Sequence, residues 1–261
     1  MTQNSQPKAK ILSLPAMLCY SSVSEQGEKN PQQPWGFYTV VVALLSGYFL
    51  LPLLAANIIL LIQHAVTTVE QLLWQQVITY ISWVLIFTVL FFRYGALQIK
   101  QELGLHFARK KRDLFWQSFQ LLALTSVLTI IVNIFWQFLE HGNPTWSVGA
   151  SPYQQYQQSE LLVLSFFAVF LAPVFEELVF RGLVQSALDR LYSPVISVLL
   201  TCGIFLFFHS TYFGNIKAIS HVLILALCLG FWRERTRSIL PGMLVHLLNN
   251  ILASSILLMP S

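Results

Sequence analysis

The chain has 261 residues, of which 56% are hydrophobic and only 10% are charged, and its mean hydropathy is +0.64. Ordinary soluble domains carry roughly 25% charged residues, so this composition excludes a soluble protein and indicates an integral membrane protein. The net charge of +4 comes from short basic clusters beside apolar runs, a pattern typical of topology determinants rather than of a nucleic-acid-binding surface. The three cysteines are odd in number and predict no disulfide framework.

Taken in chain order, the sequence begins with a polar segment, 1–34, that is rich in Gln, Ser, Pro and Lys and is predicted to be a mobile tail. Apolar segments of membrane-spanning character follow, separated by polar residues. They cover approximately residues 37–62, 77–95, 114–138, 160–190, 194–210, 218–232 and 239–258. We therefore predict an all-α integral membrane protein, a polytopic bundle of about seven (six to eight) transmembrane helices.

The positions of Lys and Arg predict the orientation of this bundle. With the N-terminus in the cytoplasm, the assignable Lys and Arg residues lie on the cytoplasmic side except Lys217, while Arg181 belongs to a buried motif. An odd number of spans then places the C-terminus outside. The basic segment Gln98–Arg112 is expected to lie along the cytoplasmic interface and to contact lipid. The small size and Gln-rich character favour a prokaryotic plasma membrane.

Two adjacent carboxylates and an arginine interrupt the apolar segment 160–190: Glu176, Glu177 and Arg181. Ionisable groups at bilayer depth cost several kcal/mol unless they are paired, so they indicate function. Glu177 and Arg181 are four residues apart with the acid first, which predicts an ion pair on one helix face. Glu176 is rotated by about 100° from that pair and is free to face another helix.

Two later segments carry polar residues at a comparable depth. His209 lies four residues after Phe205, and His246 lies four residues before Asn250. From the helix rise, Glu176 lies about 24 Å, His209 about 22 Å and Asn250 about 16 Å from the cytoplasmic ends of their helices. Helix tilt can bring these groups to one level, so we predict that they form a cluster.

The chemistry of this predicted cluster suits hydrolysis. A desolvated carboxylate can take a proton from water, and an imidazole can orient that water. An imidazole and an amide on one helix face can donate hydrogen bonds to an oxyanion. Taken singly, the Glu177–Arg181 pair would be a structural ion pair, and His209 or Asn250 would be an interhelical hydrogen-bonding group.

In chain order, the motifs Glu176-Glu177-x-x-x-Arg181, Phe205-x-x-x-His209 and His246-x-x-x-Asn250 resemble the CPBP family. This family comprises the CAAX prenyl proteases of the Ras-converting type and the bacteriocin-processing and self-immunity (Abi) proteins. The resemblance covers about residues 172–252. It implies a catalytic core at 159–258, preceded at 35–158 by N-terminal transmembrane helices and a basic cytoplasmic loop.

The resemblance further implies an intramembrane endopeptidase. Its catalytic residues would be Glu176, His209, His246 and Asn250. Glu176 would activate water, His209 would hold that water, and His246 and Asn250 would stabilise the oxyanion. The supporting residues would be Glu177, Arg181 and Phe205. A metal-free glutamate mechanism is favoured; zinc is the alternative, and its ligands would be Glu176, His209 and His246.

The expected partners are membrane lipid and a peptide or membrane-protein substrate, of the CAAX type or another membrane-associated kind, and no nucleic acid. A second hypothesis is a non-catalytic bacteriocin self-immunity or scaffold protein that binds a peptide at the same cluster. A third, a transporter or proton relay, rests on buried carboxylates alone. The lack of internal repeat symmetry in the sequence counts against it.

Overall fold

The computed structural model describes residues 36–62, 68–106, 111–139 and 157–258, so the predicted tail 1–34 lies outside the described residues. Within these ranges the chain folds into helices joined by turns, which confirms the predicted all-α membrane bundle. Five of the helices described are apolar and long enough to cross a membrane. They cover Phe37–Ala55, Glu70–Tyr94, Arg112–Leu139, Gln158–Leu188 and Ile216–Thr236.

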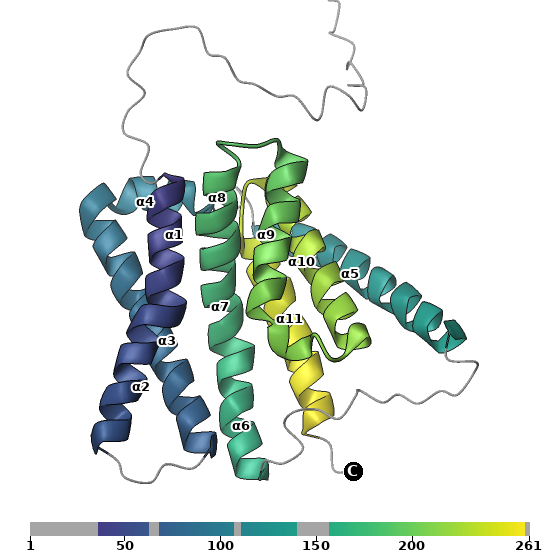
Figure 1. Ribbon diagram of the computed structural model, residues 1–261. Helices are drawn as coiled ribbons and strands as arrows, with labels where there is room; N and C mark the ends of the chain where they lie inside the picture. Colours follow the sequence, from purple (N-terminus) through teal and green to yellow (C-terminus); the bar gives the residue numbers. More distant parts are fainter. Residues whose placement is uncertain (1–35, 63–67, 107–110, 140–156, 259–261) are drawn as a thin grey trace, which may run out of the picture.

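The N-terminal helices form one side of the molecule (Figure 1). The helix α1 (Phe37–Leu45), the π-helical turn η2 (Ser46–Leu50) and α2 (Leu51–Ile62) follow one another as the first predicted span. The helix α3 (Thr68–Tyr94) packs beside them and begins earlier than predicted, because the polar turns before its apolar run are also helical. A Cβ atom at Gly47 would lie 2.8 Å from the Trp83 ring, so the glycine lets the two helices approach closely.

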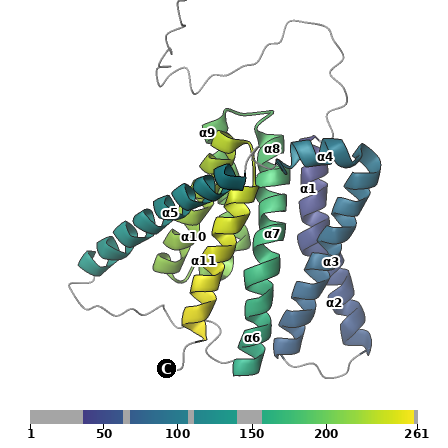
Figure 2. The same ribbon diagram turned by 180° about the vertical axis from the view of Figure 1, so that it is seen from behind.

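Two further elements connect this side to the rest. The short helix α4 (Ala96–Glu102) lies across one end of the bundle, and α5 (Lys111–Leu139) is inclined to the other helices and packs against α10 and α11 (Figures 1 and 2). Leu103, directly after α4, is buried. The predicted segment Gln98–Arg112, where it is described, therefore packs against protein instead of lying only on lipid.

The centre of the bundle is one long, composite helix (Figure 1). It consists of α6 (Gln158–Phe166), the π-helical η3 (Phe167–Leu171), α7 (Ala172–Glu176), the π-helical η4 (Glu177–Val184) and α8 (Gln185–Leu188). Its buried residues Val179, Phe180 and Leu183 belong to the main hydrophobic core. Glu176 and Glu177 thus lie at a junction of α-helical and π-helical hydrogen bonding, a feature that is frequent at functional sites.

The C-terminal helices form the other side of the molecule. They are α9 (Pro194–Phe208), a short 3₁₀ turn η5 (Ser210–Tyr212), α10 (Ile216–Thr236) and α11 (Leu240–Leu257). The helix α9 has only 15 residues, shorter than the five long apolar helices, as its predicted span 194–210 suggested. Because α9 ends at Phe208, the next residue, His209, lies within the depth of the bundle rather than at its surface.

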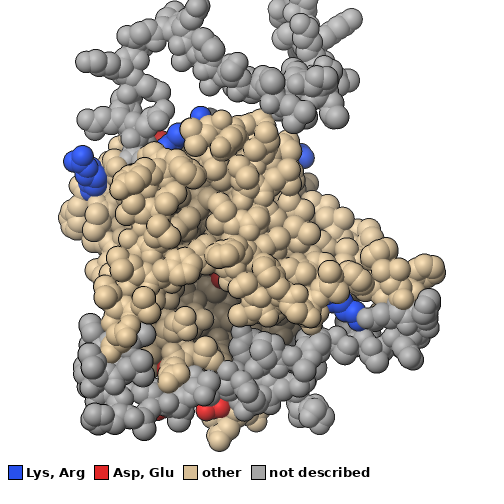
Figure 3. All heavy atoms as spheres, in the orientation of Figure 1, with Lys and Arg blue, Asp and Glu red and all other residues tan. Residues whose placement is uncertain are grey.

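Basic side chains gather at the end of the bundle where α4 lies, which we call the basic end (Figure 3). Arg93 lies in the last turn of α3, Lys100 in the last turn of α4, and Arg233 and Arg235 in the last turn of α10. Lys217 lies in the first turn of α10, at the end of that helix away from the basic end. The described Lys and Arg residues are therefore concentrated at one end of the bundle, and the predicted orientation depends on this asymmetry.

Candidate active site

The Glu177–Arg181 pair lies in the buried centre of the bundle. Arg181 Nη1 is 3.0 Å from Glu177 Oε1, and both side chains are 1% exposed. The guanidinium group also donates to the carbonyl oxygen of Ala226 in α10 at 3.1 Å and lies 4.6 Å from the centre of the Phe205 ring. Arg181 is thus held by a carboxylate, a carbonyl and an aromatic face, the partners that a cation needs in a low-dielectric interior.

His246 joins the two glutamates. Its Nδ1 is 3.1 Å from Glu177 Oε1, and its Nε2 is 3.6 Å from Glu176 Oε2. An ionised carboxylate only accepts hydrogen bonds, so Nδ1 carries a proton and donates a hydrogen bond to Glu177. This contact leaves Nε2 facing Glu176. A Cβ atom at Gly242 would lie 3.1 Å from Glu177 Oε2, so the glycine leaves room for the carboxylate beside α11.

His209 approaches Glu176 from α9. Its Nδ1 is 2.9 Å from the carbonyl oxygen of Phe205 and must therefore be the donor, which leaves Nε2 to face Glu176 Oε2 at 3.9 Å. The imidazole also stacks on the Phe205 ring, with 4.2 Å between ring centres and 29° between the planes. Phe205 therefore fixes the orientation of His209 through both its backbone and its side chain.

Glu176 is the point on which these groups converge. Its Oε2 atom is buried and forms no direct hydrogen bond with any described residue. The separations of 3.6 Å and 3.9 Å from the two imidazoles exceed a direct hydrogen bond and suit groups that act through one shared water molecule or substrate atom. We call Arg181, Glu177, His246, Glu176 and His209 the Glu–His network.

Asn250 lies on α11 one turn beyond His246, but the structure does not bring it into the Glu–His network. Its Nδ2 donates to the carbonyl oxygen of Ala168 in η3 at 2.8 Å. Among the described residues, no hydrogen bond joins Asn250 to Glu176, His209 or His246. The amide ties α11 to the composite helix two turns before Glu176.

Two tyrosines that the sequence analysis did not single out also lie near the network. Tyr48 in η2 and Tyr80 in α3 both interact electrostatically with the Glu176 carboxylate. Their only signal in the sequence is a phenol within an apolar span, where a hydroxyl group needs a polar partner.

The three zinc ligands considered from the sequence supply the nitrogen and carboxylate donors that zinc takes. Within the described part of the chain, however, no three His, Cys, Asp or Glu side chains form a group that could hold a metal ion.

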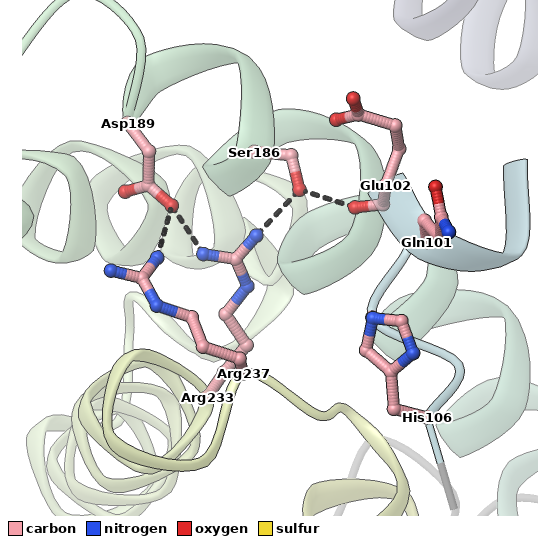
Figure 4. A pocket seen from close by; sticks show the side chains of 8 residues that line it. Gln101, Glu102, His106, Ser186, Asp189, Arg233 and Arg237 are labelled. Atoms are coloured by element: carbon pink, nitrogen blue, oxygen red, sulfur yellow. Dashed lines mark hydrogen bonds and ion pairs between the residues drawn. The ribbon is translucent and has the colours of Figure 1, made fainter. Parts of the chain in front are cut away.

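A second polar cluster lies at the basic end, around a cavity of about 350 Å³ (Figure 4). Asp189 pairs with Arg233, and Arg233 Nη2 donates to Ser186 Oγ at 2.6 Å. The Ser186 hydroxyl in turn donates to the carbonyl oxygen of Glu102 at 2.8 Å. Burial, reinforced by the neighbouring Glu234 carboxylate, raises the pKa of Asp189 to about 6 although Arg233 lowers it. This cluster connects α4, α8 and α10.

The fold and the site define the class of protein first: a polytopic α-helical membrane protein with a buried network of glutamate, histidine and arginine side chains. The family model described as Type II CAAX prenyl endopeptidase Rce1-like then matches residues 158–252. This match confirms the predicted resemblance to the CPBP family over the segment that contains the network, and it supports a membrane-embedded protease. Neither the curated proteins nor the solved structures that were compared include a match to this chain.

Proposed function

We propose that this protein is an intramembrane endopeptidase that hydrolyses a peptide bond with water activated by Glu176. The observation that carries the proposal is the convergence of His209 Nε2 and His246 Nε2 on one buried oxygen of Glu176, at 3.9 Å and 3.6 Å. The match of residues 158–252 to an endopeptidase family supports the same reaction class.

In the proposed reaction, Glu176 accepts a proton from a water molecule that His209 Nε2 orients. The water oxygen bonds to the peptide carbonyl carbon, and the carbonyl oxygen becomes an oxyanion. In its doubly protonated form, His246 keeps Nδ1 on the Glu177 carboxylate and donates from Nε2 to this oxyanion. Glu176 then transfers its proton to the leaving nitrogen as the C–N bond breaks, which yields a carboxylic acid and an amine.

The test compares full-length wild type with Glu176→Gln and His209→Ala in reconstituted membranes. General-base catalysis contributes about 10²–10⁴-fold, so Glu176→Gln should lower the cleavage rate by that factor while expression and insertion stay normal. The first probe is a prenylated CAAX-type peptide, and comparative proteomics of membranes with wild type or Glu176→Gln searches for other substrates. Cleavage by both variants at the wild-type rate would refute the proposal.

The same variant separates catalysis from the self-immunity or scaffold alternative. A protein that only binds a peptide at this site should keep its phenotype when Glu176 becomes the nearly isosteric glutamine, whereas a protease should lose it. Chelation separates a glutamate mechanism from a zinc mechanism. Activity of the purified protein that persists with EDTA and with 1,10-phenanthroline supports water activation by Glu176 alone, and activity restored only by zinc contradicts it.

A further inference from the structure

The residues that match the endopeptidase family begin at 158, yet the Glu–His network also faces the N-terminal helices. Figure 3 shows a hollow at mid-height between the side of the molecule formed by α1–α3 and the side formed by α9 and α10, and part of an acidic residue is visible within it. The two acidic residues of the network are Glu176, which is 19% exposed, and Glu177, which is 1% exposed. Glu176 is therefore partly accessible, and its surroundings include Tyr48 and Tyr80 from helices outside the matched segment.

Aromatic contacts fix these two tyrosines in place. The Tyr48 ring lies 4.3 Å from the Phe208 ring and 5.1 Å from the Trp83 ring, and the Tyr80 ring lies 5.1 Å from the Phe175 ring. Phe175 directly precedes Glu176 in the chain, and Phe208 directly precedes His209. Each tyrosine is thus packed on the neighbour of a network residue, so its hydroxyl group has a defined place relative to the reacting atoms.

The hydroxyl groups of these two tyrosines have no hydrogen-bond partner within the described part of the chain. Both side chains are half-buried. A hydroxyl in an apolar region costs free energy unless it is hydrogen-bonded, so these two groups are suited to a partner that arrives from outside the protein. Both are near enough to Glu176 to feel its charge.

We infer that Tyr48 and Tyr80 bind the substrate, by donating hydrogen bonds from their hydroxyl groups to main-chain carbonyl groups of the peptide beside the bond that is cleaved. A helical peptide has its carbonyl groups engaged internally, so this site takes an extended peptide segment. The inference rests on the proposed peptidase function, and it assigns part of the substrate site to helices outside residues 158–252.

The experiment uses full-length protein in lipid nanodiscs and a fluorogenic prenylated CAAX-type peptide as the probe. Tyr48→Phe and Tyr80→Phe remove only the hydroxyl oxygen and keep the ring contacts. Since a neutral hydrogen bond contributes about 0.5–1.5 kcal/mol, each variant should raise KM by about 2- to 10-fold with kcat unchanged. Tyr38→Phe is the matched control, because Tyr38 lies on α1 and is 80% exposed; its KM should equal that of wild type.

Unchanged KM in both tyrosine variants would overturn the inference. A shifted pH profile of kcat with unchanged KM would also overturn it, because the hydroxyl groups would then act on Glu176 and not on the substrate. The proposed function is tested separately, by comparing the cleavage rates of wild type and Glu176→Gln. Binding of the probe is therefore also measured in the Glu176→Gln variant, with and without Tyr48→Phe and Tyr80→Phe. Equal affinities would refute the inference whether or not cleavage occurs.

Discussion

Each imidazole of the Glu–His network has one nitrogen bound to the protein and one nitrogen facing Glu176. His246 Nδ1 binds a buried carboxylate, whereas His209 Nδ1 binds a neutral backbone carbonyl. The two Nδ1 partners differ in charge, so the two rings are suited to different tasks. We expect His246 to stabilise an oxyanion and His209 to orient water.

Removal of Glu177 should destabilise the protein more than removal of Glu176. Glu177→Leu leaves Arg181 buried without its carboxylate, and breaking a buried ion pair in this way costs about 3–5 kcal/mol. The double variant Glu177→Leu/Arg181→Met should recover part of that loss. Thermal unfolding in detergent measures both, with Glu176→Gln as the control that keeps the wild-type midpoint. Equal losses in the single and double variants would show that the ion pair does not determine the effect.

Asn250→Ala should reduce activity less than His246→Ala. The Asn250 amide binds the backbone of η3, so its removal loosens α11 without taking away a group that faces Glu176. We expect a loss of about 0.5–1.5 kcal/mol in unfolding free energy and a small change in kcat. Steady-state cleavage rates of both variants provide the comparison. A loss of kcat equal to that of His246→Ala would place Asn250 at the reacting atoms.

The sequence predicted a cluster of Glu176, His209 and His246 but not its geometry, and it also predicted Asn250 there, which the structure instead joins to Ala168. Helical spacing indicated the Glu177–Arg181 pair and the face shared by Phe205 and His209, because those relations lie within one helix. The contact of His246 with Glu177 depends on the register between α11 and η4, which periodicity does not determine. The partner of Asn250 was not predictable for the same reason, since Ala168 is a backbone group that carries no sequence signal.

At the scale of elements, the other helices pack around the composite helix α6–α8. At the basic end, the segment after α4 is bonded to the residues before α11: Ile239 N donates to the carbonyl oxygen of Gly104 at 3.0 Å, and the Ser238 hydroxyl donates to that of His106 at 2.8 Å. These bonds connect the N-terminal half to the start of α11, the helix that carries His246. The composition of the segment 98–112 predicted an interface location, but composition does not show hydrogen bonds to backbone carbonyl groups.

A close contact between Gly182 in η4 and Leu103 makes this docking sensitive to side-chain size. A Cβ atom at Gly182 would lie 2.9 Å from Leu103 Cδ2, and Leu103 is 2% exposed and has little room to move. Gly182→Val should therefore lower the unfolding free energy by about 1–3 kcal/mol through overpacking. Gly203→Ala in α9 meets no atom within 4 Å and serves as the control, which should be neutral or stabilising. Equal midpoints of thermal unfolding for the two variants would argue against a tight contact.

At the scale of the whole molecule, the charge asymmetry predicts that the basic end faces the cytoplasm. In a chain with Cys19→Ser, a cysteine at Arg235 would lie at the basic end. A cysteine at Gly214, which is exposed with open space around it, would lie in the turn between α9 and α10, away from the basic end. A membrane-impermeant maleimide added to intact cells should label Gly214→Cys and not Arg235→Cys. The native Cys202 and Cys228 are buried and give a low background. The reverse labelling pattern would invert the topology.

The contacts of Arg181 also have a consequence for how the protein is made. The helix that carries Glu176, Glu177 and Arg181 leaves the ribosome before its partners, since the Ala226 carbonyl lies 45 residues further along and His246 lies 69 residues beyond Glu177. Until α10 and α11 are synthesised, three ionisable side chains in an otherwise apolar span lack these partners, and their insertion into the bilayer is costly. The Glu–His network can therefore be completed only after α11 has been synthesised.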